Sequence, residues 1–241
     1  MKGKDMYNIS KKCIIFFIAL INLLACNIKK EDKKADPDSI YFDYKVTAEE
    51  GDDNLTILLQ YRDGGEQGDA MSIGEPGKVM LDGEVLTPDS TRMTGTFYEL
   101  HKPINGFSGK HSIIFTGIDK KEYREEFYFE PVSLLTPIAD TIHRLDLIAD
   151  PVIIGFSGLD REDYIRVVLT DTTYYNDGIN RVDSVRNGQL TLTKADLEEL
   201  ADGPVQLEFI REYERPVKNG TGEGGRLLIT YRLKRGFFLK E

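Results

Sequence analysis

The sequence contains very little cysteine and histidine and no tryptophan. Only two cysteines and three histidines occur in 241 residues. The histidines, His101, His111 and His143, are too scattered to form a metal-ligand spacing such as His-Glu-x-x-His. We therefore expect neither a metal site nor a cofactor.

Positive charge is also scarce. The chain has 31 Lys and Arg residues against 41 Asp and Glu residues, which gives a formal net charge of -10. An acidic balance argues against a nucleic-acid partner, since such partners are held by neutralising their phosphates. The remaining composition, 40% hydrophobic and 30% charged, is that of a folded protein with one large domain or two small ones.

The first 25 residues differ in composition from the rest of the chain. Four lysines, Lys2, Lys4, Lys11 and Lys12, precede an apolar run that ends at residue 25. A basic segment followed by an apolar one is the layout of a secretory signal peptide. The apolar run is interrupted by Asn22 and is shorter than the roughly 20 residues that cross a bilayer as a helix. We expect residues 1–25 to be removed.

The end of this segment, Leu23-Leu24-Ala25-Cys26, resembles the lipobox of bacterial lipoproteins. The resemblance implies that Cys26 is acylated and becomes the first residue, and that its lipid, including palmitate, anchors the protein. Cys13 would be removed, so no internal disulfide is expected although the protein is exported. Residues 26–38 would then be the lipidated cysteine and a polar tether.

The residues after Cys26 favour a location at the outer membrane. Asn27 stands where an inner-membrane retention signal would have Asp, and the charged stretch that follows resembles export tags of surface lipoproteins in the Bacteroidota. Exposure at the cell surface is the expectation, with the periplasmic leaflet as the alternative.

From residue 40 onward, short runs rich in Val, Ile, Thr, Tyr and Phe alternate with Gly, Asp, Asn and Pro clusters. This pattern predicts an all-β fold of two tandem immunoglobulin-like β-sandwiches. Asp82-Gly83 predicts a two-residue hairpin turn, since glycine takes positive φ at no steric cost. The expected strands are 41–48, 55–61, 78–81, 84–86, 95–101, 111–116, 123–130, 152–156, 164–171, 182–185, 189–192, 205–215, 226–232 and 237–240.

Three prolines, Pro131, Pro137 and Pro151, mark the joint between the two sandwiches, because proline cannot donate to a central ladder. The expected modules are residues 39–133 and residues 134–241. One helix is predicted over 194–201, where Thr193 and Asp196 form a capping box.

Two pairs of stretches, 107–116 with 123–131 and 197–213 with 224–232, resemble a family of Bacteroidota lipoproteins built from tandem immunoglobulin-like modules. The motifs belong to a sandwich framework. The resemblance therefore implies a fold and a cellular address, and it brings no catalytic residue.

Sequence patterns for catalysis are weak. Ser108 and Ser157 stand in Gly-Phe-Ser-Gly, but Lys110 and Leu159 occupy the positions where a nucleophile elbow needs a second glycine. We expect no catalytic residues and no enzyme. A hydrolase, the remaining alternative, would need a polar cleft, for which the region 131–151 is the obvious place.

Two surface features suggest contacts. Tyr174 and Tyr175 lie beside polar residues in a predicted loop and are candidate ligand contacts. Between residues 208 and 235, arginines alternate with glutamates on neighbouring strands, which predicts cross-strand ion pairs on a solvated sheet face.

A further motif, Asp-(Ser/Thr)-(aliphatic/Thr), occurs five times and resembles the O-glycosylation sequon of exported Bacteroidota proteins. We expect glycans on Ser39, Thr141 and Ser184. The matches are Asp38-Ser39-Ile40, Asp89-Ser90-Thr91, Asp140-Thr141-Ile142, Asp171-Thr172-Thr173 and Asp183-Ser184-Val185.

Together these patterns predict a cell-surface lipoprotein that acts as a non-catalytic binding or scaffold module. Its partners would be the membrane, through the lipid anchor, and a protein or glycan at the cell surface. The alternative function is a glycan-binding accessory subunit of an outer-membrane polysaccharide-uptake system.

Overall fold

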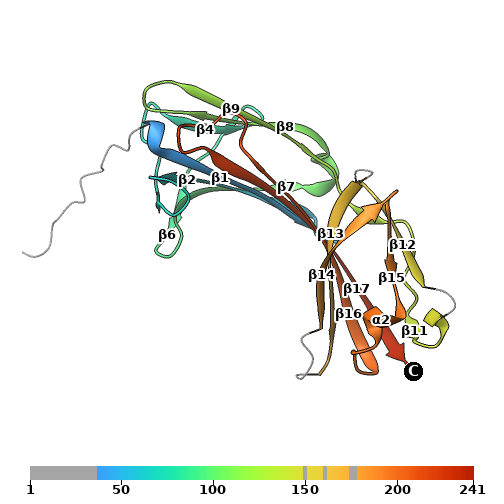
Figure 1. Ribbon diagram of the computed structural model, residues 1–241. Helices are drawn as coiled ribbons and strands as arrows, with labels where there is room; N and C mark the ends of the chain where they lie inside the picture. The colour runs from blue at the N-terminus through green and yellow to red at the C-terminus, as the bar shows by residue number, and fades with distance from the viewer. Residues whose placement is uncertain (1–36, 149–150, 160–161, 174–177) are drawn as a thin grey trace, which may run out of the picture. The chain divides into compact units, whose positions relative to one another are not determined.

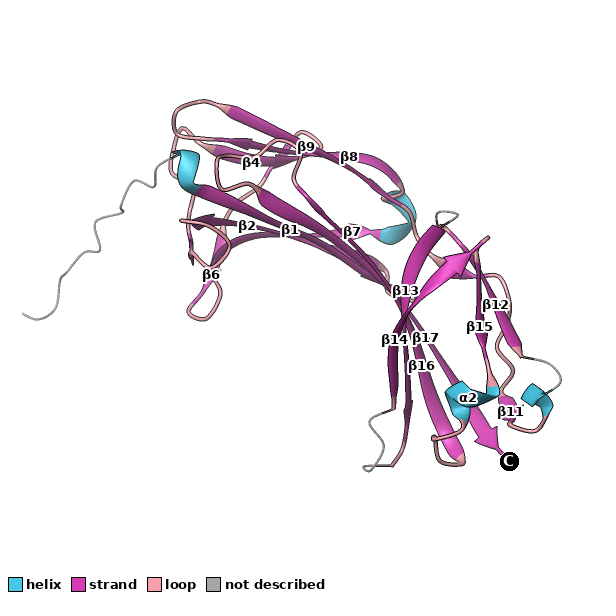
Figure 2. Cartoon of the chain, in the orientation of Figure 1, coloured by secondary structure: helices cyan, strands magenta, loops and turns pink. Residues whose placement is uncertain are grey.

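Strands dominate the computed structural model, which describes residues 37–148, 151–159, 162–173 and 178–241 (Figure 1). The prediction of an all-β fold is confirmed. The strands form one sheet of 13 strands and a second sheet of four (Figure 2). The described residues belong to a single unit, Asp36–Glu241.

The first sandwich pairs its strands in the order β1-β2-β7-β6 on one sheet and β5-β4-β8-β9 on the other. These are the ABED and C′CFG orders of an immunoglobulin-like domain. Short 3-10 turns, η1 (Pro37–Ser39) and η2 (Ile104–Gly106), lie before β1 and after β7. The strands are β1 (Ile40–Glu49), β2 (Asn54–Asp63), β3 (Asp69–Ala70), β4 (Lys78–Leu81), β5 (Glu84–Val85), β6 (Asp89–Thr91), β7 (Gly95–Pro103), β8 (Gly109–Thr116) and β9 (Glu122–Phe129).

Aromatic rings fill the core of this sandwich. Phe42 of β1 is fully buried, and its ring centroid lies 5.1 Å from that of Phe115 and 5.4 Å from that of Tyr61. Tilted and edge-to-face ring pairs at such distances contribute about 0.5–1.5 kcal/mol each beyond their buried area. The two sheets are therefore joined by ring contacts between β1 and β8.

The predicted turn at Asp82-Gly83 is confirmed. Asp82 and Gly83 both have positive φ, 48° and 88°, and Leu81 pairs with Glu84 across the turn. Two successive positive φ values are those of a type I′ turn, whose twist matches that of the flanking strands.

The second sandwich pairs β10-β12-β15 in one layer and β14-β13-β16-β17 in the other, with β11 parallel to β17. The two layers belong to one sheet because β14 pairs with β15 through Arg186 and Gln189. Between the layers, the rings of Phe156 and Phe209 meet edge to face, with their centroids 5.2 Å apart. The strands are β10 (Ser133–Leu134), β11 (Thr141–His143), β12 (Val152–Ser157), β13 (Glu162–Asp171), β14 (Ile179–Arg186), β15 (Gln189–Leu192), β16 (Gly203–Pro216) and β17 (Gly225–Lys240).

The predicted helix at 194–201 is shorter in the structure, where α2 (Lys194–Leu197) is a single turn. Its start is as predicted, because the backbone N–H of Thr193 donates to the Asp196 carboxylate at 2.7 Å. Beyond the helix, the backbone N–H of Ala201 donates to the Asp171 carboxylate at 2.7 Å. A further 3-10 turn, η3 (Asp146–Ile148), follows β11.

The hairpin formed by β16 and β17 takes part in both sandwiches (Figure 1). Its last strand pairs in parallel with β1, from Phe42 opposite Gly225 to Glu49 opposite Arg232. The prediction of separate strands at 226–232 and 237–240 is wrong, since Gln206 still pairs with Gly236 between them. The boundary at residues 133 and 134 stays a prediction.

A buried carboxylate, that of Asp43, stabilises the contact between β1 and β17. Asp43 is 3% exposed and accepts a hydrogen bond from Nε of its register partner Arg226 at 2.9 Å. The ammonium of Lys45 lies 3.2 Å from its other oxygen. Burial raises the pKa of Asp43, but Arg226 and Lys45 together outweigh it and hold that pKa below its usual value.

Candidate functional site

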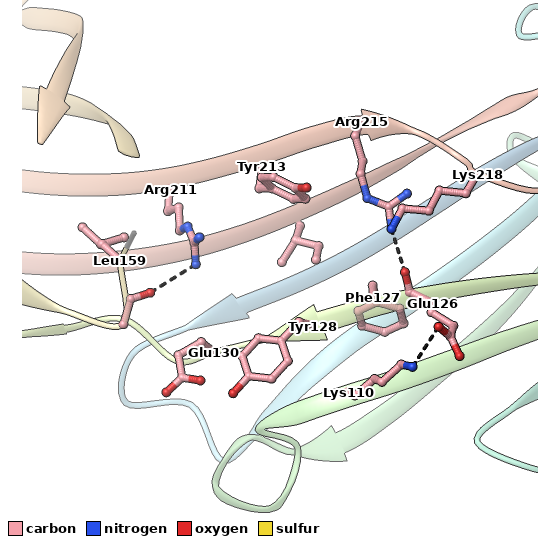
Figure 3. Close-up of a pocket in the computed structure, with 12 residues that line it drawn as sticks. Lys110, Glu126, Phe127, Tyr128, Glu130, Leu159, Arg211, Tyr213, Arg215 and Lys218 are labelled. Atoms are coloured by element: carbon pink, nitrogen blue, oxygen red, sulfur yellow. Dashed lines mark hydrogen bonds and ion pairs between the residues drawn. The ribbon is translucent and has the colours of Figure 1, made fainter. Parts of the chain in front are cut away.

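A groove of about 670 Å³ lies between β9 of the first sandwich and the distal part of β16 (Figure 3). Within the described residues, β9 pairs only with β8, and β16 beyond Arg211 pairs only with β17. Two sheet edges therefore face one another here. The buried side chains of Phe127 and Ile229 contribute apolar surface to the lining.

Two tyrosines from opposite strands are exposed along the groove. Tyr128 on β9 is 63% exposed and Tyr213 on β16 is 42% exposed. The hydrogen bond with the Glu130 carboxylate raises the pKa of Tyr128. The groove thus presents two aromatic rings to solvent.

A buried ion pair lies at one end of the groove. Glu125 is 1% exposed, and its Oε1 lies 2.7 Å from a guanidinium nitrogen of Arg215. The second oxygen of Glu125 accepts the backbone N–H of Lys218 at 2.6 Å. These contacts attach the end of β16 to β9.

The carbonyl groups along this edge of β9 are also occupied. Arg215 donates to the carbonyl oxygen of Glu126 at 2.7 Å, and the Asn219 amide donates to that of Arg124 at 2.9 Å. Side chains here take the positions that a neighbouring strand would fill.

The other end is organised by Arg211. Its guanidinium lies 2.9 Å from the Asp163 carboxylate and donates to the carbonyl oxygen of Gly158 at 3.2 Å. Arg211 and Asp163 are 15% and 13% exposed, so both are largely covered. Both arginines of the groove are therefore fixed by carboxylates outside its lining.

The lining holds more basic than acidic side chains. Four basic side chains, Lys110, Arg211, Arg215 and Lys218, stand against two acidic ones, Glu126 and Glu130. A hydrogen bond from Lys110 at 2.8 Å lowers the pKa of Glu126. Lys110, Arg211 and Arg215 are each paired with a carboxylate, and Lys218 is the basic group of the lining without an ion pair among the described residues.

The groove offers ring stacking and ion pairing. Its lining contains no histidine, serine or cysteine among the described residues. The histidines are engaged elsewhere: His111 is 2.7 Å from Asp82 and stacks on Phe107, and His101 lies 3.2 Å from Thr56. Across the described ranges, no three His, Cys, Asp or Glu side chains are grouped to hold a metal ion.

The residues proposed from sequence do not meet in this groove. Cys26, Tyr174 and Tyr175 lie outside the described residues. Ser39 donates to the Asp63 carboxylate at 2.8 Å, whereas Thr141 is half-buried in β11 and Ser184 is exposed on β14. Their glycosylation stays a prediction.

The tyrosines of the groove were missed, although the sequence holds a signal for the site. Glu125 occupies the apolar face of β9 together with Phe127 and Phe129. Arg211 and Arg215 likewise continue the buried face of β16. Arg211 pairs with Asp163 and Arg215 pairs with Glu125, and all four side chains are largely buried. This corrects the expectation that these arginines lie on a solvated sheet face.

In the described part of the chain, no helix has the length and apolar character needed to cross a bilayer.

Comparison with known proteins gives structural similarities only. No family model and no curated protein matches the sequence. Among solved structures, a 1.5-MDa bacterial ice-binding adhesin is 12% identical over 86% of this chain and 66% of its own, with a TM-score of 0.25. The two immunoglobulin domains of DIP-gamma are 10% identical over 81% of this chain and 97% of theirs, with a TM-score of 0.24. The Yersinia pseudotuberculosis adhesin InvE is 13% identical over 79% of this chain and 58% of its own, with a TM-score of 0.20. This chain thus spans slightly less than two thirds of the ice-binding adhesin structure. Similarities this low do not define a ligand or a partner for this chain.

Proposed function

We propose that this chain is a surface lipoprotein of the bacterial outer membrane that acts as a non-catalytic binding module. The observation that carries the binding role is the groove between β9 and β16, where exposed tyrosines lie beside arginines that are already fixed by carboxylates. Groups fixed before binding lose little conformational freedom when a ligand arrives.

The charged groups of the groove support binding rather than catalysis. A general base or nucleophile needs a partner within hydrogen-bond reach and a proton or bond to act on. Arg211 and Arg215 are each paired with a carboxylate, that of Asp163 and that of Glu125, which balances their charge. Such pairs hold the walls of a site in place.

Lipidation at Cys26 is the part of the proposal that concerns location. The mature chain would have this one cysteine, directly after an apolar segment, and a thioether-linked lipid explains its position. The immunoglobulin-like sandwiches would then be displayed on a polar tether, residues 27–38.

Changing Cys26→Ser is expected to release the protein from membranes. In the native host, wild-type protein should incorporate an alkyne analogue of palmitate, sediment with outer membranes and be cleaved by protease added to intact cells. Cys26→Ser should lose the label and the sedimentation, whereas the matched variant Cys13→Ser should keep both.

An unlabelled wild-type protein, or one that stays soluble, would contradict lipidation. Protection from protease until the outer membrane is permeabilised would place the module on the periplasmic side and contradict surface display.

The glycan-binding alternative depends on Tyr174 and Tyr175, which lie outside the described residues. The groove supplies an independent place for such a ligand.

A further inference from the structure

The lining of the groove limits the class of ligand that fits it. Its volume of about 670 Å³ lies within the roughly 300–1,000 Å³ that is common for small-ligand sites. Aromatic and apolar surface from Phe127, Tyr128 and Tyr213 is combined with charged groups along the rims (Figure 3). A matching ligand has an apolar face and polar edges in the same unit.

Charge selects further among such ligands. Of the four basic side chains in the lining, Arg211 and Arg215 are already paired with Asp163 and Glu125. Glu126 is already paired with Lys110. Within the described residues, no carboxylate forms an ion pair with the exposed ammonium of Lys218, which therefore remains able to meet an anionic ligand.

An extended peptide added as a strand is the less favourable occupant. Strand addition requires a row of unpaired backbone groups along a sheet edge. On β9 the carbonyl groups of Arg124 and Glu126 already accept hydrogen bonds from Asn219 and Arg215. A peptide would have to break these bonds, whereas a ligand that lies on side chains would not.

We propose that the groove binds a carboxylate-bearing oligosaccharide, that is, a chain of uronic acid units. The apolar C–H faces of its pyranose rings lie against Tyr128 and Tyr213, and its carboxylates face Lys218. Tyr128 comes from β9, whereas Tyr213 and Lys218 come from β16 and the residues after it, so both sides of the groove contribute to the site. This inference names the ligand class for the proposed binding module and rests on that function.

The test is calorimetric titration of the lipid-free chain, residues 27–241, with oligogalacturonate. The matched probe is the same oligosaccharide methyl-esterified at its carboxyl groups, which keeps the rings and removes the charge. Polyglutamate supplies the charge without the rings. We expect saturable binding of oligogalacturonate, roughly tenfold or greater weakening by esterification, and no saturable binding of polyglutamate at the same concentration.

Variants assign the binding to the groove. Tyr213→Ala and Lys218→Gln should each weaken oligogalacturonate binding by about tenfold. Lys218→Gln should also flatten its dependence on salt. Tyr164→Ala is the matched control, because Tyr164 is 62% exposed on β13 and does not line the groove. Unchanged thermal unfolding midpoints would confirm that the variants are folded.

Several results would overturn the inference. Absence of saturable oligogalacturonate binding, or binding that Tyr213→Ala and Lys218→Gln leave unchanged, contradicts the site. Equal binding of the esterified sugar contradicts the role of the carboxylate, and equal binding of polyglutamate contradicts the role of the rings. Failure of the proposed function can be distinguished from failure of this inference, since lipidation and surface exposure of the wild-type protein are measured without any sugar.

Discussion

Residues 39–133, expressed without the rest of the chain, are expected not to fold. In the full chain, β17 pairs with β1 and buries Leu227, Ile229 and Tyr231 in the first sandwich. Burial of side chains of this size contributes roughly 1.5–3 kcal/mol each. Their sum is comparable to the net stability of a whole domain, about 5–15 kcal/mol. The fragment would also expose the edge of β1 as an unpaired strand, which favours aggregation.

Urea unfolding followed by circular dichroism compares this fragment with residues 37–241. The longer chain should unfold cooperatively, and the fragment should show no cooperative transition. A fragment with a transition at the same urea concentration as the longer chain would contradict the role of β17 in the first sandwich.

Replacing Glu125→Ala is expected to cost about 3–5 kcal/mol of the free energy of unfolding. Its carboxylate is 1% exposed and pairs with Arg215, so its removal leaves a largely covered guanidinium without its counter-charge. An uncompensated buried charge has a cost of this size. The backbone N–H of Lys218 would lose its acceptor as well.

A double variant separates charge from packing in this effect. Glu125→Leu with Arg215→Met replaces both members of the pair with apolar groups and should recover most of the stability, because buried ion pairs are often replaceable in this way. The neighbouring change Glu126→Ala is the control, since Glu126 and Lys110 are 44% and 66% exposed. Equal losses from Glu125→Ala and Glu126→Ala in urea unfolding would contradict the burial argument.

Local structure was largely predictable from the sequence. The alternation in 123–130 and the Asp82-Gly83 turn depend on residues close in sequence, and the structure has strands and a type I′ turn there. The capping residue Thr193 is another example. These features follow from side-chain direction and backbone preference within a few residues.

Long-range pairing was not predictable in the same way. Strands β1 and β17 are separated by most of the chain, and no local pattern indicates that Thr47 lies opposite Thr230. The break expected between 232 and 237 is absent, because β16 continues opposite these residues and the pairing runs through them.

The groove follows from that long-range pairing, which is why its tyrosines were missed. Tyr128 has an ordinary outward position on β9, whereas Tyr213 shares its face of β16 with Arg211 and Arg215 and is 42% exposed there. What marks the site is charge at positions of the apolar face, namely Glu125, Arg211 and Arg215. Local rules that fail in this manner are expected at functional or constrained sites.

The central claim is that β17 completes the first sandwich and so places β16 opposite β9. Disulfide formation between Thr47→Cys and Thr230→Cys, in residues 27–241 without other cysteines, tests it directly. These register partners lie within the Cα separation of about 4.4–6.8 Å that a disulfide needs. The control, Thr47→Cys with Leu228→Cys, is two residues out of register and about 8 Å apart. Non-reducing electrophoresis after mild oxidation should show complete crosslinking of the first pair and little of the second, and the reverse result, or no crosslink in either, would contradict the account.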